Sequence, residues 1–340
     1  MDGKQGGYIA ARTTVLISRT ITTLDIEPGR VQVLTVEGKR VVGWGSLPLA
    51  PGLVKDCVVA DPAAVGATVA RLFSSTGASK KSVVVAITGV RSISRVLEMP
   101  KLSNRQTKEA LRWAARREMP LPLDELCLNW QCLGSRDSRQ VVFLLGTPRD
   151  VVDGFSRTLQ AAGIRPRAVD LKPLALARLA DRPEAIVINI ESESLTIVMV
   201  IDGVPRLIHT LAMRQEGLVL EDRIRQLTDY LTRTVQFYND AHPGQPLPVR
   251  TPVFLTGEMG SDVTVRHSVQ AAIEYPVEAL APCIECPPEL PLEPYAVNVG
   301  LVLRQMAPES GRAASRRLSP VKVDIMGAEH GGRWGSRLAA

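Results

Sequence analysis

Two stretches far apart in the chain have the same layout, and this repeat constrains the fold more than any other feature of the sequence. Residues 21–34 and residues 185–198 each fit a strand, a tight turn and a second strand. A further turn follows each of them, at Glu37-Gly38-Lys39 and at Asp202-Gly203-Val204, and then a third β-rich run. A β-β-β start that is used twice predicts two related α/β halves.

The turns of this repeat decide whether the chain can hold a nucleotide. Hairpins that bind phosphate have Gly, Ser and Thr in the turn, because backbone N–H groups must approach the anionic oxygens closely. Here Glu27 and Glu191 stand in the two turns. At ~4 Å a like-charge contact costs about 4 kcal/mol even at an effective dielectric of 20. The two carboxylates therefore argue against bound phosphate.

Composition and the ends of the chain limit the class of protein. A length of 340 residues with 45% apolar content allows about two domains with real cores. No apolar run approaches the ~18 to 20 residues that span a bilayer, and Arg12 and Arg19 interrupt the run at residues 8–21. Five cysteines without an export signal fit a reduced compartment. We expect a cytoplasmic protein.

The net charge of +6 is concentrated at the two ends. Residues 1–20 carry three basic side chains and one acidic one, and residues 307–340 carry six and three. A basic face for nucleic acid is therefore not expected, whereas a flexible N-terminal extension over residues 1–20 and a disordered basic tail over residues 307–340 are. An alternative use of these ends is contact with anionic lipid, although the tail has no amphipathic helix to insert.

Local patterns place the elements between these ends. Asp61-Pro62 predicts a helix start, and the buried strand 83–87 closes a β-β-β-α-β unit. A second helix is expected from residue 103 or 104 to about 118, where Pro120 follows. Other predicted elements are a strand at 92–98, strands at 126–133 and 141–146, a helix at 149–162, a strand at 168–170, a short helix at 173–179, a long helix at 221–239, a strand at 253–257, a helix at 261–273 and a final helix at 294–306.

Several motifs resemble the type IV pilus assembly protein PilM family. The most specific is Leu111-Arg112-Trp113-Ala114-Ala115-Arg116-Arg117-Glu118-Met119-Pro120-Leu121-Pro122-Leu123-Asp124-Glu125-Leu126. Further matches lie at residues 99–102, 129–131, 145–152, 162–166, 169–170, 174–178, 235–238, 254–257 and 296–304. The resemblance covers roughly residues 20–306.

This family resembles the cell-division protein FtsA, which implies an α/β, actin-like (ribonuclease H-like) fold of two domains with a nucleotide between them. The first domain would be residues 21–184 with an inserted subdomain at about 92–165, and the second, shortened, residues 185–306. The resemblance also implies a scaffold peripheral to the inner membrane, in a type IV pilus or a related type II secretion system. It would hold the cytoplasmic N-terminal tail of a PilN-like bitopic membrane protein. Self-association is left open.

The chain departs from the family at the nucleotide pocket. The family's two Asp-Ile-Gly phosphate turns appear here as Asp25-Ile26-Glu27-Pro28-Gly29 and Asn189-Ile190-Glu191, and its glycine-rich adenosine turn as Gly257-Glu258-Met259-Gly260. Residues 213–217 run almost directly into the long helix, which shortens the wall of the pocket. We therefore predict a degenerate pocket, no catalytic residue and no cofactor, that is, a pseudo-ATPase. The alternative is an actin-like ATPase with altered loops that binds ATP and Mg²⁺.

The functional prediction therefore moves to the inserted subdomain. Its candidate partner-groove residues are Trp113, Arg116, Arg117 and Trp130, against the alternative that both Trp residues belong to the core and that both Arg residues only complement a helix dipole. In the tail, Val321, Val323 and Ile325 alternate as in a strand. This segment is either a disordered remnant or a strand that adds to a sheet edge or fills the partner groove in cis.

The cysteines allow one further hypothesis. Cys283 and Cys286 have the spacing of a zinc half-site, which Cys127 and Cys132 would have to complete. A single C-x-x-C pair is a weak signal. Because free cysteine is often a small core residue, the sequence favours no metal.

Overall fold

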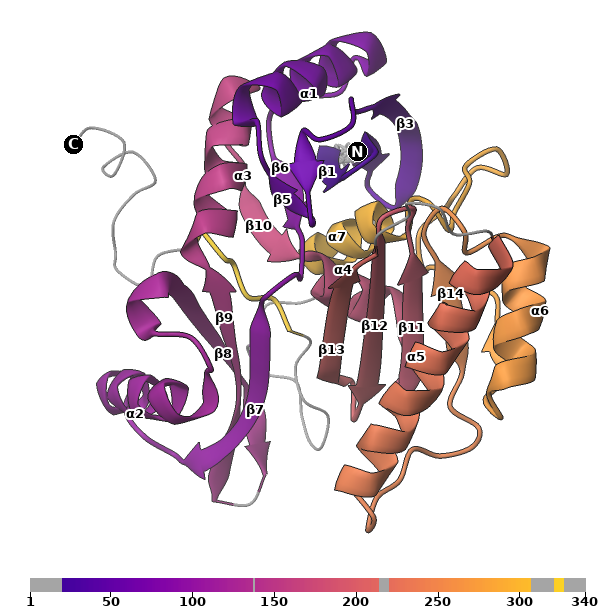
Figure 1. The fold of residues 1–340 in the computed structure, drawn as a ribbon. Helices are drawn as coiled ribbons and strands as arrows, with labels where there is room; N and C mark the ends of the chain where they lie inside the picture. The colour runs from indigo at the N-terminus through magenta and orange to yellow at the C-terminus, as the bar shows by residue number, and fades with distance from the viewer. Residues whose placement is uncertain (1–19, 137, 214–219, 307–320, 327–340) are drawn as a thin grey trace, which may run out of the picture.

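The computed structural model describes residues 20–136, 138–213, 220–306 and 321–326. In these residues no helix is long and apolar enough to cross a membrane. Two five-stranded sheets, a smaller three-stranded sheet and the helices packed on them make up the molecule (Figure 1). The prediction of a flexible extension at residues 1–20 lies outside the described residues except for Thr20, which begins the first strand.

The first half of the repeat forms one side of the first sheet. Its strands run in the order β10-β6-β1-β2-β3. They are β1 (Thr20–Glu27), β2 (Arg30–Glu37), β3 (Arg40–Pro48), β6 (Val83–Ile87) and β10 (Ala168–Leu171), with a short hairpin of β4 (Val54–Lys55) and β5 (Val58–Val59) beside them. β1 and β2 pair antiparallel up to the turn, where Glu27 lies opposite Arg30. The predicted β-β-β-α-β unit is confirmed.

Two helices pack together on this sheet. α1 (Pro62–Thr76) begins as expected, since the Asp61 carboxylate accepts hydrogen bonds from the N–H groups of Ala63 and Ala64. α3 (Arg149–Ala161) crosses it at Gly66, where a Cβ atom would lie 2.8 Å from the carbonyl oxygen of Thr158. α3 therefore belongs to the first domain, although the expected subdomain of residues 92–165 includes it.

The second half of the repeat builds the second sheet, in the order β13-β12-β11-β14-β15. Its strands are β11 (Ala185–Ile190), β12 (Ser194–Ile201), β13 (Val204–Ala212), β14 (Val253–Thr256) and β15 (Val277–Glu278). α5 (Leu220–Ala241) and α6 (Val263–Ala272) cover its outer face. The two sheets thus share the antiparallel β-β-β start and a parallel strand beside its first strand.

Two helices lie between the sheets and join their cores. α4 (Lys172–Ala180) and α7 (Ala296–Met306) share one apolar cluster with side chains from both sheets. They approach so closely that a Cβ atom on Gly300 would lie 2.1 Å from the carbonyl oxygen of Ala175. α7 also contacts β1, β2 and β6, so this helix, expected in the second domain, packs on the first.

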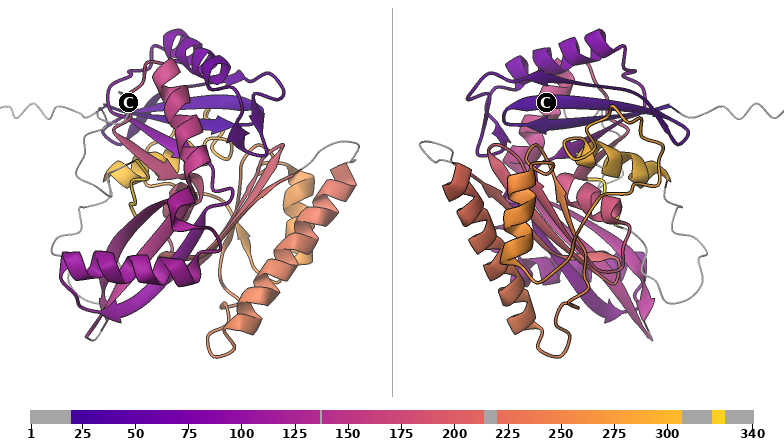
Figure 2. Two further views of the ribbon diagram at one scale, coloured as in Figure 1. Left: turned by 60° about the vertical axis from the view of Figure 1, so that its left-hand side comes forward. Right: turned by 90° about the vertical axis from the view of Figure 1, so that its right-hand side faces the viewer.

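The inserted subdomain lies between β6 and β10 in the sequence and projects from the first domain (Figure 2). Its sheet has the order β7-β9-β8, with β7 (Ile93–Pro100), β8 (Leu126–Arg136) and β9 (Arg139–Pro148). α2 (Asn104–Glu118) covers one face and starts with a capping box between Ser103 and Gln106, and the 3-10 turn η1 (Leu123–Glu125) leads into β8.

A short segment near the C-terminus fills the other side of this sheet. Residues 321–326 pack between the inserted subdomain and the first domain, with Val321, Val323 and Ile325 buried in the core. The prediction of a disordered tail over residues 307–340 is therefore wrong for these six residues. The apolar side chains at alternate positions of this segment are buried in the main core, which orders the segment.

Candidate functional site

The pocket predicted at the two turns contains a lysine, Lys172, between the carboxylates of Asp25 and Glu27. β1 ends at Glu27, and α4 begins at Lys172 directly after β10. The Lys172 ammonium lies 3.0 Å from Asp25 Oδ1 and donates a hydrogen bond to Glu27 Oε1. All three side chains are almost fully buried. The space beside the first turn is thus occupied by an ion-paired cation from the chain itself.

An arginine connects the first turn to the second domain. Arg30, the first residue of β2, places its guanidinium 2.6 Å from Glu191 Oε2 and 3.2 Å from Glu258 Oε2. Glu191 follows β11 and Glu258 follows β14, so both acceptors come from the second sheet. The buried pair of Arg30 and Glu191 therefore bridges the two halves of the repeat.

The remaining predicted pocket residues surround this bridge. Asn189 accepts a 2.9 Å hydrogen bond from the Thr256 hydroxyl and donates one of 3.3 Å to Glu191 Oε1. Gly257 has a φ of 85°, and a Cβ atom there would lie 2.6 Å from the carbonyl oxygen of Ile190 and 2.9 Å from Glu191 Oε1. This turn can lie against β11 only because it carries glycine.

The structure therefore brings together the eight residues predicted for the pocket, since Gly29 faces Ser192 across the interface and Gly260 lies against Thr256. Sequence reasoning missed Lys172 and Arg30. The sequence marks both residues by their position. Lys172 is the one charged residue between Leu171 and Leu176, and Arg30 lies directly after the Glu27-Pro28-Gly29 turn.

Burial in this cluster shifts the pKa of Glu27, Glu191 and Lys172. Burial raises the pKa of Glu191 to about 8, and the nearby Glu27 adds to the increase while Arg30 opposes it. Burial likewise raises the pKa of Glu27 against the attraction of Lys172. Burial disfavours the charged form of Lys172, but Asp25 and Glu27 outweigh it and raise the pKa of that ammonium.

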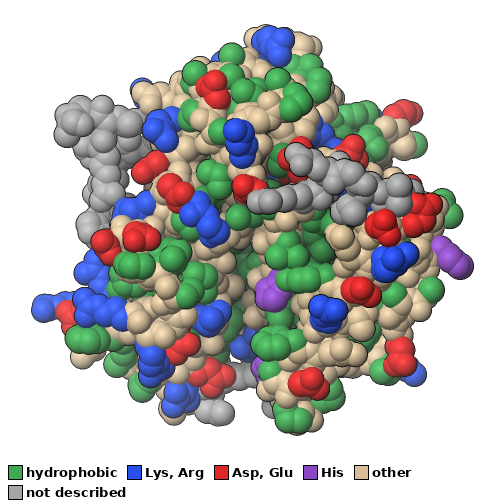
Figure 3. All heavy atoms as spheres, viewed as in Figure 1, with side chains coloured by type: hydrophobic (Ala, Val, Ile, Leu, Met, Phe, Trp, Pro, Cys, Tyr) green, Lys and Arg blue, Asp and Glu red, His purple; other side chains and the backbone are tan. Residues whose placement is uncertain are grey.

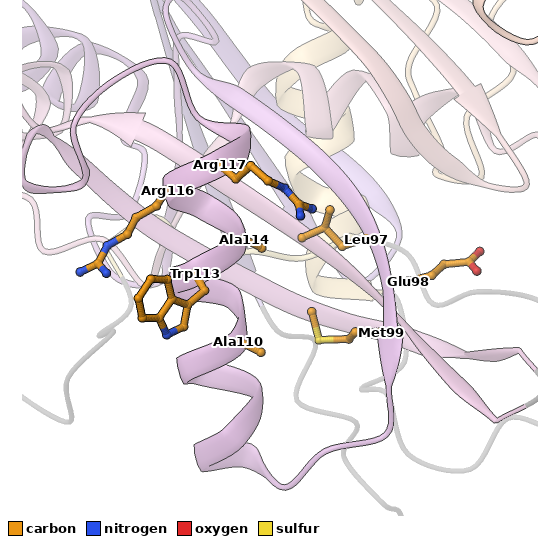
Figure 4. Close-up of a pocket in the computed structure, with 8 residues that line it drawn as sticks. All are labelled: Leu97, Glu98, Met99, Ala110, Trp113, Ala114, Arg116 and Arg117. Atoms are coloured by element: carbon orange, nitrogen blue, oxygen red, sulfur yellow. The ribbon is translucent and has the colours of Figure 1, made fainter.

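A second candidate surface lies between α2 and β7. It is a groove of about 660 Å³ lined on one side by Trp113, Arg116 and Arg117 and on the other by Leu97 and Met99. Trp113 is 69% exposed, and the Arg116 guanidinium lies 4.8 Å from the centre of its ring (Figure 4). We call this surface the outer groove.

Trp130 does not line the outer groove. Its side chain packs under α2 against two small apolar clusters of the subdomain. On β8 it belongs to the face that α2 covers, as in the alternative that it is part of the subdomain's core. Asn129 and Gln131 belong to the opposite face.

A third candidate surface is the space in which residues 321–326 lie. We call it the inner slot. Its sides are β8 of the inserted subdomain, the edge strand β10 and the helices α4 and α7. The expected tail residues Val321, Val323 and Ile325 are each less than 5% exposed there. The structure assigns them to no strand, but their alternate burial is as predicted.

The cysteines do not form a common site. Among the described residues no three His, Cys, Asp or Glu side chains lie close enough together to hold a metal ion. Cys283 is exposed and Cys286 half-buried, whereas Cys127 lies in the subdomain and packs against the main core.

On the face in Figure 3, basic and acidic side chains are interspersed over both halves of the molecule.

Lys172→Met should destabilise the protein by about 3 to 5 kcal/mol, because Asp25 and Glu27 would stay buried without their cation. Urea unfolding measures this loss. Lys39→Met, on the exposed hairpin turn between β2 and β3, is the matched control and should change the free energy of unfolding little. An equal, small effect of both substitutions would contradict the buried ion pair.

Glu191 should make stability depend on pH. A carboxyl whose pKa rises from 4.5 to about 8 on folding stabilises fully below pH 4.5, and this contribution is lost as the pH rises towards 8. Glu191→Gln removes the titration and should flatten the fall in the free energy of unfolding across this window, by up to about 1.4 kcal/mol per pH unit. Urea titrations between pH 5 and pH 8 test this, and identical pH profiles for both proteins would refute it.

Comparison with known proteins agrees with this fold. One solved structure, a PilM-PilN type IV pilus biogenesis complex, superposes with a TM-score of 0.68 at 24% identity, over 85% of this chain and 99% of that one. The ethanolamine utilization protein EutJ from Carboxydothermus hydrogenoformans follows with a TM-score of 0.50 at 12% identity, over 84% and 89%. The chain has the expected actin-like α/β fold.

A family comparison identifies the group to which the chain belongs. Residues 24–221 match the profile of the family described as type IV pilus assembly protein PilM. The matched part starts in β1 and ends in α5, so it includes both halves of the repeat and the whole inserted subdomain. The chain is a member of the type IV pilus assembly protein PilM family.

Proposed function

We propose that this protein is a cytoplasmic scaffold of a type IV pilus assembly complex at the inner membrane, where it binds the cytoplasmic tail of a PilN-like membrane protein. Membership of the PilM family supports the assembly role. The similar solved structure is that of a PilM-PilN complex, which supports a PilN-like partner. Attachment to the membrane would then be indirect, through this partner.

One observation carries the binding part of the proposal. An extended segment, residues 321–326, lies between the inserted subdomain and the first domain, and side chains from both hold its main chain. A surface that holds an extended peptide is what a short membrane-protein tail requires, because main-chain hydrogen bonds give affinity and alternate side chains give specificity.

The inner slot suits such a tail better than the outer groove. Its donors are buried and already directed at main-chain oxygens, so they are preorganised for an extended chain. The charged side chains that line the outer groove, Glu98, Arg116 and Arg117, are part of the subdomain's solvent-facing surface. The outer groove, predicted from sequence, remains a second candidate surface for the same tail.

Nucleotide hydrolysis is not part of the proposed function. In a pocket shaped for Mg-ATP, the acidic groups would face a cleft open to phosphate and metal. Here Asp25, Glu27 and Glu191 are each less than 5% exposed and already paired with Lys172 or Arg30. These residues do not fit Mg-ATP, because entry of phosphate would separate buried ion pairs and place anions against carboxylates.

Titration with Mg-ATP should therefore give no saturable heat and no rise in Tm, because a ligand that bound the folded state would stabilise it. Isothermal calorimetry and thermal unfolding on the full chain measure both quantities. An actin-like ATPase run under the same conditions is the positive control. Saturable binding together with a dose-dependent Tm increase would refute the pseudo-ATPase proposal.

A fluorescent peptide with the sequence of the PilN-like partner's N-terminal tail should bind the full chain, as measured by anisotropy. Trp113→Ala should leave this affinity within a factor of about two, because the residue lies in the outer groove. A large loss of affinity in Trp113→Ala would place the tail in the outer groove. Absence of binding to any variant would refute the proposed partner.

A further inference from the structure

The inner slot recognises its occupant mainly through the main chain. Gln131 accepts a hydrogen bond from the Lys322 N–H, and Asn129 donates one of 3.5 Å to the carbonyl oxygen of Ile325. The Ile325 N–H donates to the carbonyl oxygen of Val169 at 2.9 Å. Because every residue type carries these groups, such contacts accept different sequences.

Two arginines complete this recognition from the helices. Arg178 on α4 donates to the carbonyl oxygen of Val321 at 2.6 Å, and Arg304 on α7 donates to that of Lys322 at 3.1 Å. Both guanidiniums are anchored on the fully buried Asp170 carboxylate. Asp170 therefore fixes two donors at the positions where an extended chain presents consecutive carbonyl groups.

The occupant also protects a sheet edge. β10 is the last strand of the first sheet, and an uncovered edge presents unpaired N–H and C=O groups. The Asp324 carboxylate accepts a 3.0 Å hydrogen bond from the Val169 N–H, and the Ile325 N–H pairs with the Val169 carbonyl. Both main-chain groups of Val169 are thereby satisfied by the segment.

Side chains supply the apolar part of the recognition. Val321, Val323 and Ile325 belong to the main core cluster, which also contains Val169 and Leu171 of the first domain and Phe143 and Leu145 of the subdomain. The slot therefore selects a short extended peptide with apolar residues at alternate positions and a carboxylate beside the last of them.

We propose that residues 321–326 are an exchangeable ligand of the inner slot, which they occupy in the isolated chain, and that the tail of the membrane partner binds there by displacing them. The inference rests on the proposed function for the identity of the partner, but the slot's affinity for a peptide is independent of it. The segment is suited to exchange because its main-chain contacts are ones that another extended peptide can repeat.

The test uses the full chain with Val323→Asp, which puts a charge into the core position of the segment and should release it from the slot. A fluorescent peptide of residues 319–328 should then bind this variant at least about ten-fold more tightly than it binds the wild-type chain, where the cis segment competes. Val263→Asp, the same substitution at a 79% exposed position on α6, is the control and should behave as the wild type.

Three outcomes separate the inference from the proposed function. If the peptide of residues 319–328 binds neither chain while Val323→Asp unfolds cooperatively, the inference is overturned. If a PilN-like tail binds the wild type and Val323→Asp equally, displacement is overturned and the partner proposal stands. If only the chain's own peptide binds Val323→Asp, the slot is supported and the proposed partner fails.

If Val323→Asp does not fold, a variant with an inserted protease site tests the same inference. A protease site inserted between Gly311 and Arg312 allows the wild-type chain to fold before the segment is cut from it. An excess of the 319–328 peptide should then release the cut fragment, as measured by size exclusion and mass spectrometry. A fragment that stays bound in the presence of this excess would overturn the exchange.

Discussion

The cluster of buried charges at the two turns of the repeat is the interaction on which the rest of the structure depends. Removing charges from water costs several kcal/mol per ion, and only close partners of opposite sign recover this cost. Lys172 neutralises the carboxylates at the end of β1, and Arg30 reaches from β2 to Glu191 in the second domain. An opening between the two domains would separate the Arg30 guanidinium from the buried Glu191 carboxyl, whereas Lys172 would keep its partners on β1.

The backbone at both turns keeps a regular arrangement around this cluster. In the first hairpin β1 and β2 pair in register up to Glu27 and Arg30. In the second half, Gly257 permits the close approach of its turn to Ile190. The backbone thus brings the two turns together, while the side chains of Arg30 and Glu191 connect the domains.

The sequence could predict those features that depend on neighbours along the chain. The repeat identified the three antiparallel strands that begin each half, and Asp61 and Ser103 marked helix starts through local caps. The contacts of Lys172 with Glu27 and of Arg30 with Glu191 join residues about 145 and 161 positions apart, and no local pattern specifies them. The same holds for residues 321–326, whose alternation is visible in the sequence but whose partners, Gln131 and Arg178, come from distant elements.

One short junction belongs to both candidate sites. β10 ends and α4 begins at Asp170-Leu171-Lys172, and the side chains of Asp170 and Lys172 face different clusters. Asp170 anchors the two arginines of the inner slot, while Lys172 holds the carboxylates of Asp25 and Glu27 at the end of β1. Because these buried ion pairs fix Lys172, they also fix the backbone from which Asp170 positions Arg178 and Arg304. The ion pairs at the end of β1 therefore contribute to the preorganisation of the peptide slot at the same junction.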